Sequence, residues 1–291
     1  MTVLDVDHLR SWIGKQETLR DQVTRFPIAA LSATLDRDDP APQAGDALPP
    51  LWHWLYFLPT ARQSILGPDG HPARGGFLPP VPLPRRMWAG GRFTFHQPLR
   101  VDETITRVST VQDVTVKHGR NGALCFVLVK HEVSGQNGLA LVEEHDIVYR
   151  DMPQPGEAPA APKPVRTDDT WSREIHPTDP LLFRYSALTF NSHRIHYDRR
   201  YVTETEGYPG LIVHGPLIAT LLIDLLRRNT DRTVASFRFR AVSPLFDIAP
   251  FSVHGAPDDT GGASIWARNA AGHVAMEAEA TLAKNRLSFC V

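Results

Sequence analysis

The chain has 291 residues, of which 42% are hydrophobic and 22% are charged. These values are typical of a globular protein with enough chain to bury a core, so a disordered or collagen-like chain is excluded. The 31 Lys and Arg residues nearly balance the 32 Asp and Glu residues, for a net charge of -1. This balance argues against nucleic acid as a partner and against a polybasic contact with a membrane.

The chain has features of a cytoplasmic protein. Its two cysteines cannot form a disulfide scaffold, and residues 1–16 lack the basic and apolar segments of a signal peptide. The most apolar stretch, 211–226, is interrupted by polar residues and is too short to span a bilayer. We therefore expect a cytoplasmic protein that does not insert into a membrane.

A proline-rich segment divides the chain into two nearly equal halves. Residues 153–168 contain five prolines and almost no large apolar side chains, a composition typical of an extended linker. This predicts an N-terminal unit at 1–152 and a C-terminal unit at 169–291.

Both halves contain segments rich in β-branched and aromatic residues, separated by short Gly- and Asn-containing turns. Such spacing predicts antiparallel strands. The predicted strands in the first half are 92–101, 104–118, 122–134 and 139–151. In the second half they lie within 234–246, 247–257 and 263–283.

One helix is predicted between these two groups of strands. The segment 210–228 is apolar on nearly all sides and ends in Arg227 and Arg228, which suit a helix C-terminus. Pro216 lies near its start, where proline is tolerated. A helix that is apolar all round must be covered, and a sheet curled around it is the simplest cover.

The two halves share a faint internal repeat. Residues 33–36 (ATLD) resemble 188–191 (LTFN), and the pairs Arg92-Phe93 and Arg238-Phe239 also correspond. A duplicated unit would explain both the length and the linker, although chance similarity remains an alternative at this stage.

The densest group of polar residues lies in the segment 185–198, YSALTFNSHRIHYD. Asn191, His193, His196 and Asp198 fall within eight positions there, which indicates either a functional site or a surface loop with capping side chains. A metal site is disfavoured, because a third ligand at helical spacing and the zinc hydrolase motif are both missing. We expect no metal.

A second candidate element is His214-Gly215, at the start of the predicted helix. A helix N-terminus offers free N–H groups and positive potential, and glycine lets a ligand approach the backbone. This arrangement can hold a developing oxyanion. The alternative is an ordinary helix start with a buried, hydrogen-bonded histidine.

Together, TFNSHRIHYD and the later GLIVHGPL resemble the hotdog-fold R-hydratase (MaoC-like) family. The family motif is Asp-x-Asn-Pro-x-His, followed later by His-Gly at the start of the hotdog helix. Asn191 falls on the catalytic Asp of that motif and His196 on its catalytic His. His193 and Arg194 take the Asn-Pro positions, and Asp198 matches an acidic residue that often follows.

Three segments are similar to one branch of this family, which contains mesaconyl-C4-CoA and itaconyl-CoA hydratases. They are FNSHRIHYD, LPPLWHWLYF at 48–57 and RRMWAGGR at 85–92. Yeast-type mitochondrial 3-hydroxyacyl-thioester dehydratases are relatives. The resemblance covers nearly the whole chain. It implies an α+β double hotdog, with two antiparallel sheets each wrapped around a central helix. If Asp36 aligns with Asn191, Ala41 stands where the C-terminal half has His196, and the N-terminal site is degenerate.

The resemblance implies reversible addition of water to an α,β-unsaturated acyl-CoA. His196 would transfer the proton, Asn191 would orient the water, and the Gly215 N–H would hold the thioester oxygen. His193 or Asp198 could assist in place of the missing carboxylate. Residues implied in substrate binding are His193, Arg194, Asp198, His214, Arg184 and Arg92.

A C4 or C5 dicarboxylyl-CoA is the expected substrate, and its free carboxylate needs a cationic partner. Arg184, Arg194 and Arg92 are candidates, although each could instead bind CoA phosphates or be solvated. Three alternatives stay open: a dehydratase of unbranched 3-hydroxyacyl thioesters, a hotdog thioesterase, and a non-catalytic acyl-CoA-binding module. No cofactor is expected beyond the CoA of the substrate, and the expected partners are the acyl-CoA and a second copy of the chain in a homodimer.

Overall fold

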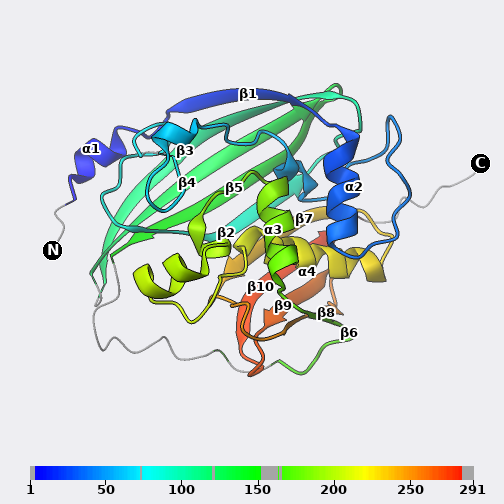
Figure 1. The fold of residues 1–291 in the computed structure, drawn as a ribbon. Helices are drawn as coiled ribbons and strands as arrows, with labels where there is room; N and C mark the ends of the chain where they lie inside the picture. The colour runs from blue at the N-terminus through cyan, green and yellow to red at the C-terminus, as the bar shows by residue number, and fades with distance from the viewer. Residues whose placement is uncertain (1–3, 73, 120–121, 152–162, 164–165, 284–291) are drawn as a thin grey trace, which may run out of the picture.

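The computed structural model describes residues 4–72, 74–119, 122–151, 163 and 166–283 (Figure 1). The predicted linker at 153–168 lies mostly outside these described residues. The helices are α1 (Val6–Arg10), α2 (Arg25–Thr34), η1 (Trp52–Leu55), η2 (Gln63–Ile65), α3 (Asp179–Leu188), η3 (Arg194–His196), η4 (Tyr201–Thr205) and α4 (Gly215–Asn229). The strands are β1 (Gln16–Gln22), β2 (Arg85–Phe95), β3 (Thr104–Gly119), β4 (Gly122–Gly135), β5 (Gly138–Arg150), β6 (Trp171–Ile175), β7 (Val234–Ala241), β8 (Phe251–Pro257), β9 (Ala263–Arg268) and β10 (Val274–Leu282).

The ten strands form one antiparallel sheet in the order β1-β3-β4-β5-β2-β7-β10-β9-β8-β6. The order is symmetric about its centre, because β1, β3, β4, β5 and β2 correspond in turn to β6, β8, β9, β10 and β7. The internal repeat is therefore structural, and each half contributes five strands. This arrangement fits a double hotdog in which the two expected sheets are joined edge to edge.

The halves join where β2 pairs with β7, along a seam of stacked aromatic rings. Phe93 lies opposite Phe237 and its ring also stacks on Phe239. The strand predicted at 92–101 corresponds to β2, which begins at Arg85. The earlier residues were missed because glycines usually weaken strands. Here a β-carbon at Gly90 would lie 2.7 Å from the Phe239 carbonyl oxygen, so the close approach of β7 requires glycine.

The long apolar helix is confirmed as α4, which begins at Gly215. Every residue from Leu217 to Leu226 is buried, and the helix packs on the strands β6, β8, β9 and β10 of its own half. In Figure 1, α4 lies against the sheet with α3 and α2 nearby. Among the described residues, no helix is long and apolar enough to cross a membrane.

The N-terminal half differs from the expectation of one central helix per half. Between α2 and β2, the described residues form only the short turns η1 and η2. Trp52 of η1 fills part of the space, since it is 1% exposed and belongs to the same core cluster as α4. Pro59, Pro68 and Pro72 within this segment explain the change, because a proline in the interior of a helix removes a hydrogen bond and clashes with the preceding turn.

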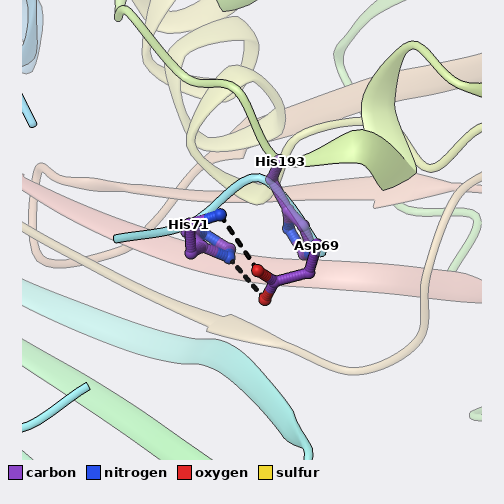
Figure 2. A group of neighbouring side chains, drawn as sticks. All are labelled: Asp69, His71 and His193. Carbon is purple, nitrogen blue, oxygen red and sulfur yellow. Dashed lines mark hydrogen bonds and ion pairs between the residues drawn. The ribbon is translucent and has the colours of Figure 1, made fainter. Parts of the chain in front are cut away.

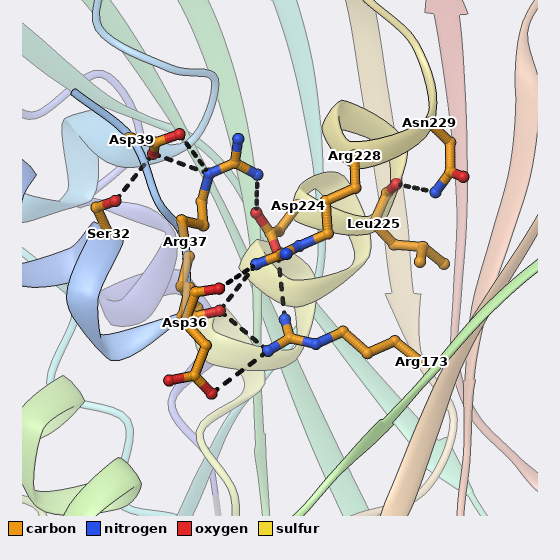
Figure 3. A network of polar contacts seen from close by, with 10 residues as sticks. Ser32, Asp36, Arg37, Asp39, Arg173, Asp224, Leu225, Arg228 and Asn229 are labelled. Atoms are coloured by element: carbon orange, nitrogen blue, oxygen red, sulfur yellow. Dashed lines mark hydrogen bonds and ion pairs between the residues drawn. The ribbon is translucent and has the colours of Figure 1, made fainter.

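A buried carboxylate on α4 links the two halves through ion pairs (Figure 3). Asp224 of α4 is 1% exposed and forms ion pairs with Arg37 at 2.7 Å, Arg228 at 2.7 Å and Arg173 at 3.3 Å. Arg173 and Arg228 also donate to the carbonyl of Leu35 at the end of α2. One carboxylate thus holds α4, β6 and the C-terminus of α2 in place.

Asp224→Asn is expected to lower the free energy of unfolding by about 3–5 kcal/mol, because it leaves three neighbouring cations without their buried partner. Asp36→Asn is the matched control. Asp36 belongs to the same network, but its side chain is 89% exposed, and asparagine tolerates its φ of 53°. The control should cost less than about 0.5 kcal/mol. Urea denaturation followed by tryptophan fluorescence measures both, and equal losses would contradict this role of Asp224.

Candidate active site

Asn191 is placed by the way α3 ends. Phe190 adopts the left-handed conformation, with φ 48°, just after the C-cap residue Thr189. The N–H of Asn191 then donates to the Ser186 carbonyl at 2.8 Å, which is the long hydrogen bond of a Schellman motif. The Asn191 Oδ1 accepts from the backbone N–H of His193 at 3.0 Å. Because Oδ1 accepts this hydrogen bond, the Nδ2–H groups of Asn191 are the donors that could bind a ligand.

The same motif ends α2 and corrects the alignment of the repeat by one residue. Asp36 has φ 53°, and the Arg37 N–H donates to the Ser32 carbonyl at 3.0 Å. Arg37, not Asp36, therefore corresponds to Asn191, and the position five further on is Pro42, not Ala41. The N-terminal half still lacks the histidine.

His196 lies in the turn η3, and its ring orientation is fixed by a backbone carbonyl. Its Nδ1 is 2.7 Å from the carbonyl oxygen of Ile212. A carbonyl only accepts hydrogen bonds, so Nδ1 carries the hydrogen and Nε2 holds the lone pair in the neutral ring. The ring is 7% exposed. This is the geometry of a general base with one free nitrogen.

His214 and Gly215 lie beside His196 at the start of α4. The rings of His196 and His214 are stacked, with centroids 3.7 Å apart, and His214 Nε2 is 2.8 Å from the Ser186 hydroxyl. The first hydrogen bond within α4 runs from the Ile218 N–H to the His214 carbonyl, so the helix itself leaves the N–H of Gly215 without a partner. The space where a Gly215 β-carbon would lie is open, and a ligand oxygen could approach there.

A loop from the N-terminal half completes the surroundings of the motif. The Arg194 N–H donates to the Asp69 carbonyl at 2.9 Å, and the Ser192 hydroxyl donates to the Gly70 carbonyl at 2.6 Å. Gly70 has φ 88°, and a β-carbon there would overlap the Ser192 carbonyl. The sequence must therefore have glycine at this position for the loop to dock.

The docked loop brings Asp69 and His71 next to His193 (Figure 2). His71 donates to Asp69 twice, from its backbone N–H at 3.0 Å and from Nδ1 at 3.1 Å. Its ring lies against that of His193, with centroids 4.1 Å apart, and the His193 ring is 5.5 Å from that of His196. Together with His214, four imidazoles and the Asp69 carboxylate thus gather at the motif.

Burial keeps these imidazoles neutral. It lowers the pKa of His196 from 6.5 to about 4, with the Ile212 carbonyl acting in the opposite direction. Burial also lowers the pKa of His193, of His214 and of His71, although Asp69 opposes the shift at His71. Burial acts to raise the pKa of Asp69, but its bonds from His71 outweigh this and hold that pKa below its usual value.

The structure places Arg194 and Asp198 in structural roles. The Arg194 guanidinium forms an ion pair with Asp198 at 2.7 Å, donates to the Pro68 carbonyl and lies over the ring of Tyr201. The other Asp198 oxygen accepts from the Tyr201 N–H. These contacts fix η3 and the docked loop, and they occupy both charged groups.

The other two predicted arginines do not reach this cluster. Arg184 is exposed on α3, two positions from Leu182 and Ser186, which are buried on the opposite side of the helix. Arg92 alternates with the buried Phe93, so it lies on the outer face of the sheet, where it pairs with Glu144 and Asp146. Contact of Arg92 with a substrate at His196 is therefore ruled out by the register of β2.

Sequence reasoning missed Asp69, His71 and Ser186. Asp69 and His71 lie 120 residues or more before the motif, in the segment 67–72 (GPDGHP), which looks like an ordinary turn. The one available signal was the Asp-Gly-His pattern, in which glycine permits a tight turn between two polar side chains. Ser186 was hidden within a helix.

Comparison with known proteins identifies the family of the chain. Residues 51–247 match the family model of hydroxyacyl-thioester dehydratase type 2. The chain is 49% identical over 251 residues to a mesaconyl-C4-CoA hydratase of Chloroflexus aurantiacus, which covers 85% of this chain and 89% of the relative. It is 28% identical over 268 residues to the mitochondrial hydroxyacyl-thioester dehydratase type 2 of Schizosaccharomyces pombe, covering 81% and 88% of the two chains.

Solved structures confirm the fold. HtdX of Mycobacterium tuberculosis superposes with a TM-score of 0.62 at 19% identity, covering 91% of this chain and 99% of that one. A MaoC-like dehydratase of Phytophthora capsici gives 0.68 at 12% identity, covering 97% and 99%. An M. tuberculosis protein with a double hotdog fold gives 0.57 at 13% identity, covering 93% and 96%. The chain is therefore a double-hotdog enzyme of the hydratase and dehydratase class, and it belongs to the hydroxyacyl-thioester dehydratase type 2 family.

Proposed function

We propose that the protein adds water reversibly to an α,β-unsaturated acyl-CoA whose acyl group has a second, free carboxylate. The observation that carries this proposal is the polar character of the space around His196. His71, His193 and the amide of Asn191 lie there, whereas a pocket for an unbranched fatty acyl chain would be lined by apolar side chains.

The similarity to a mesaconyl-C4-CoA hydratase supports the same substrate class. In mesaconyl-C4-CoA the free carboxylate is attached to the carbon β to the thioester, which is the carbon that water attacks. A carboxylate side chain at position 191 would repel this group. Asn191 removes the repulsion and offers N–H donors instead, so the departure from the family motif suits a dicarboxylyl substrate.

In the proposed mechanism His196 performs both proton transfers. Its Nε2 takes a proton from water as the oxygen bonds to the β-carbon, and the electrons of the double bond move to the thioester oxygen. The Gly215 N–H at the start of α4 stabilises this enolate oxygen. The His196 imidazolium then returns its proton to the α-carbon, so the water is added in full and the neutral base is restored.

The second candidate function is dehydration of unbranched 3-hydroxyacyl thioesters. Two yeast relatives are named hydroxyacyl-thioester dehydratases. The same His196 geometry would serve it. A cytoplasmic location, a homodimer, and the absence of any cofactor besides the CoA of the substrate remain predictions from the sequence.

His196→Ala is expected to lower kcat/KM by about 10²–10⁴-fold, because the group that moves the proton is lost. Hydration of mesaconyl-C4-CoA, itaconyl-CoA and crotonyl-CoA by purified protein measures this. The control is His176→Ala, since the His176 side chain is 66% exposed. Turnover of crotonyl-CoA alone would favour the unbranched substrates, and binding of all three without turnover would leave a non-catalytic module.

The pH profile should show the lowered pKa of His196. The base must be neutral, and burial lowers its pKa from 6.5 to about 4, so the neutral form persists as the pH falls below 6.5. We expect kcat/KM not to fall in that range and to decrease only as the pH approaches about 4. Circular dichroism at each pH controls for acid unfolding. If kcat/KM instead fell to half its maximum near pH 6.5, burial would not be lowering the pKa of His196.

A further inference from the structure

We propose that His71, held by Asp69, binds the free carboxylate of the acyl group together with His193 and Arg86. This inference rests on the proposed function and assigns a specificity site to the loop of the N-terminal half. Asp69 acts as a positioning residue, and His71, His193 and Arg86 contact the ligand.

The positions of the rings fit the shape of the ligand. His196 lies next to His193, and His193 lies next to His71, with ring centroids 5.5 Å and 4.1 Å apart. A carboxylate on the β-carbon lies one bond beyond the carbon that His196 serves. It would extend away from His196 toward His193 and His71, while the thioester lies toward Gly215.

His71 is the imidazole of this group that lies beside a carboxylate, and burial keeps it neutral until a ligand enters. Its Nδ1 donates to Asp69 at 3.1 Å, which leaves Nε2 for a ligand. With Asp69 on one side and a substrate carboxylate on the other, two anions favour the imidazolium form. His71 would then donate a charge-assisted hydrogen bond, which is stronger than a neutral one.

Arg86 adds permanent positive charge nearby, from an exposed position on β2. It lies on β2 opposite Tyr149 of β5, close enough to lower the pKa of both His71 and His193. The charged groups that act on His71 are Asp69, Arg86 and Arg74, so their net charge is +1 before His71 is protonated. A net positive site suits a carboxylate, and none of the arginines predicted from the sequence provides one near His196.

Asp69, His71 and His193 also resemble a metal site, since one ligand atom from each lies within 4.8 Å of the others. The neighbouring Arg86 disfavours a cation there, because like charges repel. Binding that depends on a metal would overturn the proposal.

The test compares succinyl-CoA with butyryl-CoA by isothermal titration calorimetry. These acyl groups have the same length and differ in the terminal carboxylate, and neither can be hydrated. The unaltered protein should bind succinyl-CoA about tenfold or more tightly, the value of one charge-assisted hydrogen bond. His71→Gln and Arg86→Gln should each reduce this preference by about tenfold and leave butyryl-CoA binding unchanged. His176→Gln, at an exposed histidine, should leave both affinities unchanged.

Asn191→Asp provides an independent variant. Adding a negative charge beside the ligand carboxylate should weaken succinyl-CoA binding and leave butyryl-CoA binding within about twofold. Equal weakening of both ligands would overturn the placement of the carboxylate next to Asn191.

The remaining outcomes separate this inference from the proposed function. Equal affinity of the unaltered protein for succinyl-CoA and butyryl-CoA would overturn the carboxylate site. An equal loss of affinity for both ligands in His71→Gln would also overturn it. A preference that appears only with added Zn²⁺ and disappears with EDTA would also overturn it. A preference that depends on His71, in a protein that hydrates no dicarboxylyl-CoA, would support the site and overturn the proposed function.

Discussion

The candidate site depends on one close approach between two backbone segments, at Gly70 and Ser192. A β-carbon at position 70 would overlap the Ser192 carbonyl, and the left-handed φ of 88° also favours glycine. The Ser192 hydroxyl and the Arg194 N–H then bond the carbonyls of Gly70 and Asp69. Without this contact, Asp69 and His71 would not lie beside His193.

Burial has a chemical consequence at the assembled site. Two imidazoles as close as His196 and His214, with rings 3.7 Å apart, could not both be charged without strong repulsion. Burial lowers the pKa of each, so both are neutral near pH 7. His214 can then serve as a fixed surface against which His196 stacks. The free nitrogen of His196 therefore stays unprotonated near pH 7.

Sequence reasoning predicted the features that local pattern determines. The apolar run around Leu217–Leu226 could only be a covered helix, and alternation with short turns identified strands such as β4. It failed where distant segments meet. Gly90 looked like a strand breaker until β7 was placed against it, and Asp69 and His71 looked like a turn until Ser192 was docked on it. Arg92 looked like a binding residue because the face of the sheet on which it lies was not known. That face follows from the register of β2, which begins seven residues before the predicted strand.

The two copies of the repeat show how the halves have divided their roles. Both α2 and α3 end in the same Schellman motif, and the residue after it is Arg37 in one half and Asn191 in the other. Arg37 pairs with Asp39 and with Asp224 of α4, so the N-terminal copy stabilises the helix whose N-terminus serves the site. The loop that replaces the N-terminal central helix reaches across to the motif and supplies Asp69 and His71. A central helix in the N-terminal half would occupy the chain that forms this loop, so the N-terminal half can supply Asp69 and His71 only because it lacks that helix.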